Sequence, residues 1–492
     1  MARLNDQRLV TVSIMLATVM QVLDTTIANV ALPHMQGSLS ASTDQITWVL
    51  TSYIVAAAIM TPTVGFMASR LGRRRLFLWS VAGFTVTSGL CGLSASLDQM
   101  VLFRILQGVF GAALVPLSQS VLLDAYPVEK HGQAMAIWGM GVMVGPILGP
   151  TLGGWLTEWY SWRWVFYINL PFGLLAFAGI WLSVSETETR KVRFDIMGFA
   201  YLGLAIGAFQ LMLDRGEQVQ WFESFEIQLE AVLALLGLYL FVVHSLTRKD
   251  PFIDPALFKD RNFVTGLVFI FVVGIILLAT MALLPPFLQQ WKDYPAVTTG
   301  LVLAPRGLGS MFSMMLVGRL MRTRLDPRVL VITGLLFITF SLHEMAGFTL
   351  EVSRNTLIWT GVLQGLGLGL VFVPASALTY ATLNPSLRTE GASLFSLSRN
   401  LGSSVGISIM TAMLSRNLWI NQQQLGEHLQ LAPWLSQGLP MKEMVGSVPA
   451  AVYQTLLSQA AEISYMNDFR LLMWINMAAI PLVFLLRHQR RV

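Results

Sequence analysis

The sequence predicts an all-α membrane protein, and three observations carry that prediction. Of its 492 residues, 54% are hydrophobic and only 12% are charged, which is about half the charged fraction of a soluble globular protein. Long apolar runs recur along the whole chain without the alternation of apolar and polar residues that membrane strands show. Most basic residues fall in short segments between these runs. Because a bilayer offers backbone groups no partner, each run is expected to be a helix.

Fourteen runs approach the length of about 20 residues that a helix needs to cross a bilayer. They are expected at 10–31, 46–68, 76–96, 100–122, 134–156, 164–184, 196–213, 228–247, 263–288, 298–320, 328–348, 356–382, 392–414 and 467–486. Arg3 and Arg8 precede the first run, and no small-residue cleavage site follows it. We therefore expect an uncleaved first span and not a signal peptide.

The distribution of lysine and arginine predicts the orientation. Of 32 such residues, 22 fall in segments on the side of the N-terminus, 7 on the opposite side and 3 within runs. Cytoplasmic loops of membrane proteins carry the excess of positive charge, so both termini are expected in the cytoplasm. The formal net charge of +5 is thus assigned to topology, and no nucleic-acid partner is expected. Cys91 is the only cysteine, which excludes a disulfide framework within the chain.

The chain repeats itself weakly, which predicts two related halves. "GFMASRLGRRR" (65–75) recurs as "GRLMRTRLDPR" (318–328), and "RILQGVFGAALVP" (104–116) is echoed by "GVLQGLGLGLVFVP" (361–374). We expect a six-helix bundle at 1–184, two inserted helices at 185–261 and a second six-helix bundle at 262–492. Two parallel halves with a site between them form a secondary-transporter plan.

An outer segment at 415–466 lies within the second half and includes "PAAVYQTLLSQAAEISY", a candidate amphipathic helix. Two interpretations stay open for it. It is a packed connector that caps the outer mouth, or it docks another protein outside the membrane.

The fifth run contains "GMGVMVGPILGPTLGG", whose glycines recur every fourth residue. Gly141, Gly145, Gly149 and Gly153 share one face of a helix and allow a neighbouring helix to approach closely. Close packing explains the glycines alone. Pro146 and Pro150 remove two backbone donors and are expected to bend the helix, which suits a helix that rocks against its neighbour.

Several motifs together resemble the major facilitator superfamily. "GPILGPTLGG" is similar to its antiporter motif, "RILQGVFGAA" to its fourth-helix motif and "LDTTIANVALP" to the first-helix motif of its fourteen-span drug:proton antiporters. "SWRWVFYINLP" and "LDRG" resemble further signatures of that branch, and the chain is most similar to EmrB-type multidrug exporters along nearly its whole length. The resemblance implies the major facilitator fold, a bacterial inner membrane, a proton-exchanging exporter of amphipathic compounds, a periplasmic adaptor protein and an outer-membrane channel.

The loop after the second run departs from the superfamily pattern. "GFMASRLGRRR" keeps the conformational motif residues Gly65, Arg70, Gly72 and Arg73 but has Ser69 where the superfamily has aspartate. A charge-pair latch through position 69 is therefore not expected.

Asp24 is the one ionisable residue of the first run. A charge in the bilayer costs about 2.5–3.5 kcal/mol on insertion scales and commonly marks function. At 1.5 Å per residue, Asp24 lies roughly 12 Å and Arg104 roughly 7 Å below the same surface, so contact is feasible. Burial would favour proton binding by Asp24 and a nearby Arg104 would oppose it. We predict a proton-coupling pair; the alternative is a structural buried ion pair.

Polar side chains within other runs are predicted to contact substrate: Gln21, Gln107, Arg306, Gln364 and Arg399. For the arginines, the alternative is that they hold helix ends through backbone carbonyls.

The sequence offers no enzyme signature. "GSSVG" (402–406) matches a nucleophile-elbow pattern but lies in a helical run without a preceding strand. The histidines lack metal-ligand spacing, and no Gly-Lys pair occurs, so neither a metal, a cofactor nor a phosphate-binding loop is expected. The energy source is then an ion gradient or a partner. A rival interpretation is a transporter of one native metabolite, such as a fatty acid; a membrane enzyme or receptor would need a polar cluster or a ligand domain.

Overall fold

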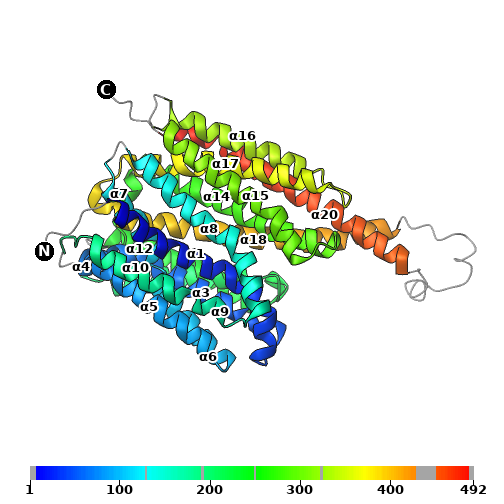
Figure 1. Ribbon diagram of the computed structural model, residues 1–492, viewed down its shortest axis with the longest axis horizontal. Coiled ribbons are helices and arrows are strands. Elements are labelled where there is room, and N and C mark those ends of the chain that lie inside the picture. Colours follow the sequence, from blue (N-terminus) through cyan, green and yellow to red (C-terminus); the bar gives the residue numbers. More distant parts are fainter. Residues whose placement is uncertain are drawn as a thin grey trace, which may run out of the picture.

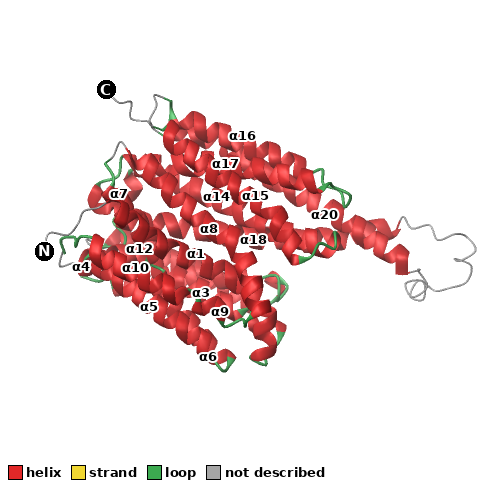
Figure 2. Ribbon diagram, in the orientation of Figure 1, coloured by secondary structure: helices red, strands yellow, loops and turns green. Residues whose placement is uncertain are grey.

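The computed structural model describes residues 7–127, 130–189, 193–248, 251–321, 325–427 and 450–486. Within these ranges every regular element is a helix, as Figure 2 shows. The all-α prediction is confirmed.

The N-terminal bundle contains six long helical segments, several of them built from two consecutive helices (Figure 1). In chain order they comprise α1 (Gln7–Ser38); α3 (Trp48–Met60) with η1 (Thr61–Thr63) and α4 (Val64–Leu71); α5 (Arg73–Leu93); α6 (Leu97–Gly111) with α7 (Leu114–Ala125); α8 (His131–Trp159); and α9 (Trp164–Tyr167) with α10 (Asn169–Ser183). The short α2 (Thr43–Ile46) begins at Ser42, whose side chain and Gln45 form a capping box.

The C-terminal bundle repeats this plan. Its helices are α13 (Ala256–Lys259); α14 (Arg261–Pro286) with the π-helical η4 (Phe287–Trp291); α15 (Ala296–Leu320); α16 (Pro327–Met345); α17 (Arg354–Ala381); η5 (Pro385–Leu387) with α18 (Arg388–Glu427); and α20 (Ala450–Ala479) with η6 (Pro481–Leu485). α14 packs along α18, and α15 along both α17 and α8 of the other bundle.

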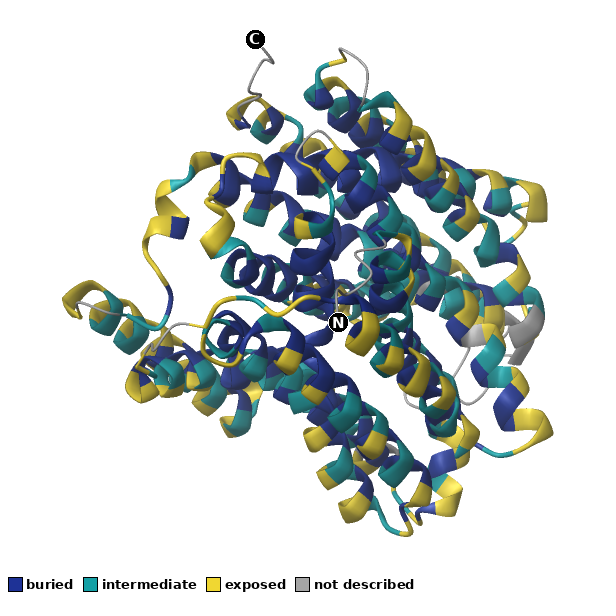
Figure 3. Ribbon diagram, turned by 60° about the vertical axis from the view of Figure 1, so that its left-hand side comes forward, coloured by how far each residue is buried: buried dark blue, intermediate teal, exposed yellow. Residues whose placement is uncertain are grey.

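An extra helix pair, α11 (Ile196–Arg215) and α12 (Phe225–Thr247), is joined by a turn that includes η3 (Trp221–Glu223). α11 packs against α3, where Ile59 fills the space over Gly203 and Gly207. α12 packs mainly against α11, and its outward face exposes large apolar side chains such as Leu235 and Leu246, at 70% and 81%. Figure 3 shows this pattern throughout: buried residues lie where helices meet, and exposed ones face outward. Such apolar outer faces are what a lipid-embedded bundle requires.

Among the described residues, thirteen helical segments are long and apolar enough to cross a membrane. α18, which covers the run expected at 392–414, does not reach that hydropathy, so the count of fourteen stays a prediction. The reason lies in its composition, because serines recur along it and most of them are buried against neighbouring helices. A helix packed between other helices does not need the apolar surface that lipid demands.

Basic side chains gather at one end of the bundles, near the starts of α5 and α18; we call it the basic end. There Asp124 of α7 forms ion pairs with Arg73 and with Arg388 of the other bundle. The Asp124 Oδ1 to Arg388 Nη1 distance is 2.9 Å. Close to this ion pair, Tyr380 donates to Gln119 Oε1 at 3.2 Å. These contacts join the two bundles at the basic end.

At the opposite end, which we call the hairpin end, α18 and α20 continue past their neighbours (Figure 1). Polar side chains link the two helices: Asn421 donates to Ser464 Oγ at 2.9 Å and Gln422 to the Tyr453 hydroxyl at 3.2 Å. The expected outer segment at 415–466 is thus helical at both ends, and its part at 428–449 lies outside the described residues. Its expected amphipathic helix is continuous with the last long helix.

Candidate functional site

Asp24 and Arg104 meet inside the N-terminal bundle. Asp24 lies on α1 with 2% of its surface exposed, and Arg104 on α6 with none. Arg104 Nη1 is 2.7 Å from Asp24 Oδ2. The structure thus brings the two predicted residues into a buried ion pair, as their estimated depths allowed.

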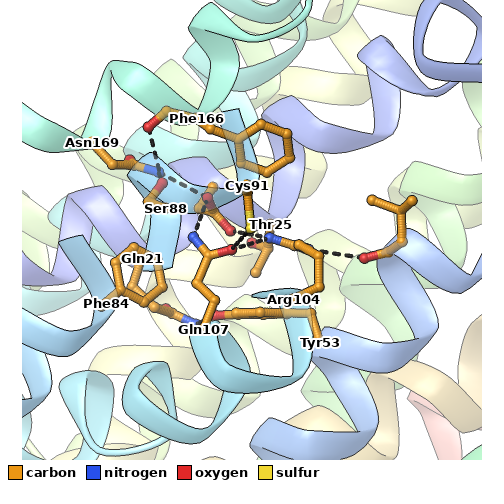
Figure 4. A network of polar contacts seen from close by, with 12 residues as sticks. Gln21, Thr25, Tyr53, Phe84, Ser88, Cys91, Arg104, Gln107, Phe166 and Asn169 are labelled. Atoms are coloured by element: carbon orange, nitrogen blue, oxygen red, sulfur yellow. Dashed lines mark hydrogen bonds and ion pairs between the residues drawn. The ribbon is translucent and has the colours of Figure 1, made fainter. Parts of the chain in front are cut away.

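Two amides complete the coordination of the carboxylate. Gln107 Nε2 and Asn169 Nδ2 both donate to Asp24 Oδ1, at 2.9 and 2.8 Å. Arg104 is held in turn: its Nε donates to the Val49 carbonyl and its Nη1 to Gln107 Oε1, both at 2.8 Å. Figure 4 shows the side chains of Arg104, Gln107 and Asn169 converging. A buried charge is tolerated when it is paired and hydrogen-bonded in this way.

A second layer of contacts holds these groups in place (Figure 4). Asn169 also donates to Ser88 Oγ at 2.9 Å, and Gln21 donates to the Tyr53 hydroxyl at 3.0 Å. The Arg104 guanidinium carbon lies 4.3 Å from the centre of the Tyr53 ring, within cation–π range. Helices α1, α3, α5, α6 and α10 all contribute to the network, so a shift of any of them changes the surroundings of Asp24.

The sequence did not single out Asn169, Ser88 or Tyr53. Asn169 stands in "SWRWVFYINLP", a motif noted only for its resemblance, and it begins α10. The same run also carries the Tyr167 hydroxyl, so nothing in its composition marked Asn169 as the residue that faces Asp24. The structure places Gln107 in the Asp24 network, and its expected contact with substrate stays a prediction.

The glycine face of α8 positions α1, the helix that carries Asp24. A Cβ at Gly145 would come within 2.4 Å of Val22, and one at Gly149 within 2.1 Å of Thr26. The Thr26 hydroxyl donates to the Gly145 carbonyl at 3.1 Å. Gly141 and Gly153 face α1 in the same way, against Met15 and Ile27. The ridge therefore packs within one bundle.

The expected bend of α8 at its two prolines stays a prediction. The side chains of Pro146 and Pro150 lie outside the described residues, and α8 is helical from His131 to Trp159. The opposite face of α8 meets the C-terminal bundle, where Ile147 packs over Gly307 of α15.

The predicted substrate residues of the C-terminal bundle lie at two places. Arg306 of α15 is 6% exposed; its Nη2 donates to the Leu277 carbonyl at 3.3 Å, and its buried Nε has no hydrogen-bond partner among the described residues. Gln364 of α17 donates to Thr280 Oγ1 at 3.2 Å. Arg399 of α18 lies with its guanidinium carbon 5.9 Å from the Trp138 ring of α8. No carboxylate forms an ion pair with either arginine among the described residues.

The conformational motif lies at the basic end. Gly72 has a φ of +87°, which a side chain rarely adopts, and a Cβ there would strike Glu186. Gly65 lies against the backbone of Glu390 in the other bundle. Arg70 is exposed, and Ser69 donates to the Gly65 carbonyl of its own helix at 3.0 Å. Asp124 supplies the carboxylate that pairs with Arg73.

Among the described residues, no group of three or more His, Cys, Asp or Glu side chains could hold a metal ion. The donors to Asp24 belong to α6 and α10, so a shift of either helix against α1 would change the polar contacts of the carboxylate; its role in proton coupling stays a prediction.

Known proteins resemble the chain over most of its length. The family model described as the Major Facilitator Superfamily matches residues 14–407. The fatty acid resistance protein FarB of Neisseria gonorrhoeae is 39% identical over 422 residues, 85% of this chain and 83% of that protein. The multidrug export protein EmrB of Escherichia coli K12 is 38% identical over 427 residues, 86% and 82% of the two chains.

Solved structures of low sequence identity share the fold. The proton:xylose symporter XylE superposes with a TM-score of 0.62 at 13% identity over 96% of both chains. The human organic anion transporter MFSD10 superposes with a TM-score of 0.59 at 15% identity, over 96% of this chain and 99% of that one.

Proposed function

Because the chain belongs to the Major Facilitator Superfamily, we propose that it exports amphipathic or hydrophobic compounds in exchange for protons, by alternating access between its two bundles. The export of many compounds rests on the similarity to the EmrB multidrug export protein. Proton exchange rests on one observation above all: the buried carboxylate of Asp24 is held by donors from two other helices, Arg104 and Gln107 of α6 and Asn169 of α10.

In this proposal the Asp24 carboxylate alternates between an ionised and a protonated state. With Arg104, Gln107 and Asn169 in place, three donors and a positive charge stabilise the ionised form. If the bundles tilt and one donor withdraws, the same buried carboxylate takes a proton, because an unpaired charge in the bundle is costly. Asp24 then carries a proton through one half of the cycle and releases it in the other.

The contacts at the basic end support alternating access. Among the described residues, the side-chain hydrogen bonds between the two six-helix bundles are those of Asp124 with Arg388, Gln119 with Tyr380, and Ser120 with Thr389. All lie toward the basic end. We take this end as cytoplasmic, with both termini there, so that the structure is the state closed toward the cytoplasm. Opening it requires the ion pair between Asp124 and Arg388 to break, because that pair joins the two bundles.

The expected localisation is the bacterial inner membrane. A periplasmic adaptor protein and an outer-membrane channel are proposed partners, and the hairpin formed by α18 and α20 is the part of the chain placed to meet an adaptor. Its exposed Trp419, at 61%, supports such a contact.

A second candidate function is export of one native anionic lipid, such as a fatty acid. It is favoured by Arg306, which lies nearly buried with no carboxylate partner among the described residues, and by the similarity to FarB, a fatty acid resistance protein. An anionic head group at Arg306 would supply the missing charge.

Proton–substrate exchange in everted membrane vesicles tests the main proposal. With an imposed proton gradient, amphipathic substrates added to wild-type vesicles should evoke proton efflux from the vesicle lumen, and Asp24→Asn should abolish it. One proton that moves through a membrane potential of 100 mV supplies about 2.3 kcal/mol, enough for roughly a fifty-fold concentration gradient of a neutral substrate. Proton movement that persists in Asp24→Asn would remove Asp24 from the mechanism. Substrate transport by wild type without proton movement would exclude antiport.

A further inference from the structure

A second carboxylate lies within a membrane-spanning helix and is not used by the proposed Asp24 cycle. Asp214 belongs to the "LDRG" motif in the last turn of α11 and is half-buried. Its described hydrogen bond comes from Thr51 of α3, whose hydroxyl donates to Asp214 Oδ2. The adjacent cation points elsewhere, because Arg215 pairs with Glu226 of α12 and lies 5.4 Å from the Trp48 ring.

The carboxylate of Asp214 therefore has fewer hydrogen-bond donors to stabilise its ionised form than the carboxylate of Asp24 has. Asp24 receives a guanidinium and two amide donors, whereas Asp214 receives one hydroxyl. Hydrogen bonds from charged donors favour ionisation more than those from a neutral hydroxyl. Asp214 also stands one residue before α11 ends at the hairpin end, so a proton from water outside the bilayer has a short path to it.

The turn of α11 that holds Asp214 touches both bundles. On one side Asp214 accepts from Thr51. On the other side Gln210 donates to Ser404 Oγ at 2.8 Å and Ser408 donates to the Leu213 carbonyl at 2.9 Å, both on α18. Because α3 and α18 belong to different bundles, a tilt of one against the other must change the contacts of this turn.

The same stretch of α3 connects Asp214 to the Asp24 site. The Val49 carbonyl accepts from Arg104 Nε at 2.8 Å, and the Tyr53 ring lies under the Arg104 guanidinium. Thr51 stands between these two positions and reaches Asp214 on the other side of the helix. A displacement of α3 thus acts on both carboxylates.

The charged groups described near this end of α11 belong to α11 itself and to α12. From α12 come Glu226, which pairs with Arg215, and Glu230, whose Oε2 is buried without a hydrogen-bond partner among the described residues. The described polar contacts of α3 and α18 with this turn are the hydroxyls of Thr51, Ser404 and Ser408.

We propose that Asp214 is a second proton-binding carboxylate of the transport cycle, linked to Asp24 through α3. This inference rests on the proposed proton exchange. When α3 holds Thr51 against Asp214, the ionised carboxylate gains a charge-assisted hydrogen bond; when α3 moves away, Asp214 binds a proton from the hairpin end. By linkage, proton binding at Asp214 must favour the arrangement of α3 in which that hydrogen bond is lost.

Infrared difference spectroscopy of the full chain in lipid nanodiscs tests the proposal without requiring transport. The pH is changed between about 5 and about 9, a range that brackets raised carboxyl titrations, and the C=O stretch of protonated carboxyls is followed. Asp214→Asn should remove one titrating band that Asp24→Asn leaves in place. Thr51→Val should move the midpoint of that band upward by about one pH unit, the shift expected for a lost hydrogen bond to a charged group.

Asp214→Asn separates proton binding from structure, because the asparagine carbonyl still accepts from Thr51. A merely structural Asp214 would be rescued by asparagine, with a wild-type pH profile of substrate transport; a proton-binding one would show a flattened profile. The proposal is overturned if no C=O band depends on residue 214, or if the pH profile of Asp214→Asn equals wild type. If Asp214→Asn fails to fold, the band shift in Thr51→Val decides. Failure of the proposed proton exchange would be seen in a different measurement. Wild-type vesicles would then show no substrate-evoked proton movement, while the C=O band of Asp214 would still titrate.

Discussion

The Asp24 site and its counterpart in the C-terminal bundle are built alike and charged differently. The weak repeat aligns Gln107 with Gln364, and in each bundle this glutamine donates to the first long helix: to Asp24 in one, to Thr280 in the other. Each bundle also brings one buried arginine near by. In the N-terminal bundle it is Arg104, three residues before the glutamine; in the C-terminal bundle Gly361 takes that place and Arg306 lies against it from α15.

The difference teaches how one fold divides two tasks. In the N-terminal bundle the Arg104 guanidinium and the Asp24 carboxylate neutralise each other, so this ion pair is balanced without a ligand. In the C-terminal bundle Thr280 supplies no charge, and Arg306 keeps a buried Nε without a partner among the described residues. A buried cation of this kind is costly until an anion arrives. The asymmetry therefore suits a proton site in one bundle and an anion site in the other.

The same substitution in the two bundles should have opposite consequences, and this is the largest effect expected. Arg104→Met leaves the Asp24 carboxylate buried without its cation and should destabilise the chain by about 3–5 kcal/mol when Asp24 is ionised. Arg306→Met removes a charge that no carboxylate balances and should cost little or increase stability. Thermal unfolding of both purified variants measures the contrast. Equal losses would mean that the C-terminal arginine has an unseen counter-ion.

Removing one amide donor from each bundle should separate the sites further. Asn169→Leu takes a hydrogen bond from the Asp24 carboxylate, and Gln364→Leu takes one from the neutral Thr280 hydroxyl. A hydrogen bond to a charged group is worth about 1.5–3 kcal/mol and a neutral one about 0.5–1.5 kcal/mol. Asn169→Leu should therefore shift the pH profile of proton exchange, while Gln364→Leu should not.

If Asn169→Leu and Gln364→Leu gave the same pH profile of proton exchange, the assignment of the proton site to the N-terminal bundle would be wrong. The retained ion pair at 2.7 Å makes Asn169→Leu milder than Arg104→Met, which keeps the variant suitable for transport measurements.

Installing the missing carboxylate tests the anion site directly. Thr280→Asp places an acid opposite Gln364, as Asp24 lies opposite Gln107. If Arg306 binds anionic substrates, the new carboxylate should compete for it, and affinity for a fatty acid should fall about ten-fold, or about 1.4 kcal/mol. Affinity for a neutral amphipathic dye should stay within about two-fold. Isothermal titration calorimetry on the detergent-solubilised protein measures the affinities for the fatty acid and for the dye, with Thr280→Asn as the uncharged control. A parallel loss for dye and fatty acid would indicate general disruption of the site.

The sequence predicted the Asp24–Arg104 contact because a charge stands out in an apolar run and helical rise fixes its depth. It could not predict Asn169 or Tyr53, because uncharged polar residues near helix ends are common and their facing depends on how the helices rotate. The role of Asp124 was missed for a related reason: Ser69 in the motif argued against a latch there, and the pairing carboxylate comes from a distant helix. The number of membrane spans stays a prediction because of α18. Much of this helix is buried between other helices, so its residues need not be apolar.

An ion pair with one solvent-exposed partner, Asp195 with Arg248, should show how much of the Asp24 effect comes from burial of both partners, and it is the smallest effect expected. Asp195 directly precedes α11 and lies outside the membrane-spanning segment. Its carboxylate accepts a hydrogen bond from the Gly198 N–H and pairs with His244 and Arg248. Burial raises the pKa of Asp195, but those hydrogen bonds and positive charges outweigh it and hold the pKa below its ordinary value.

Because the folded-state pKa of Asp195 is depressed, its stabilisation is present above the unfolded value of about 3.9 and is lost as pH falls through the folded value. Asp195→Ala also removes a helix cap and should lower the free energy of unfolding by about 1 kcal/mol near neutral pH; Asp195→Asn keeps the cap and should lose less. Unfolding midpoints at neutral pH and near pH 3 measure both, and the deficit of Asp195→Asn should vanish in acid. Since Arg248 is 43% exposed, solvent screens this pair, whereas the Asp24 pair is dry. A deficit as large as that of Arg104→Met would show that burial is not what makes the Asp24 site sensitive to its charge.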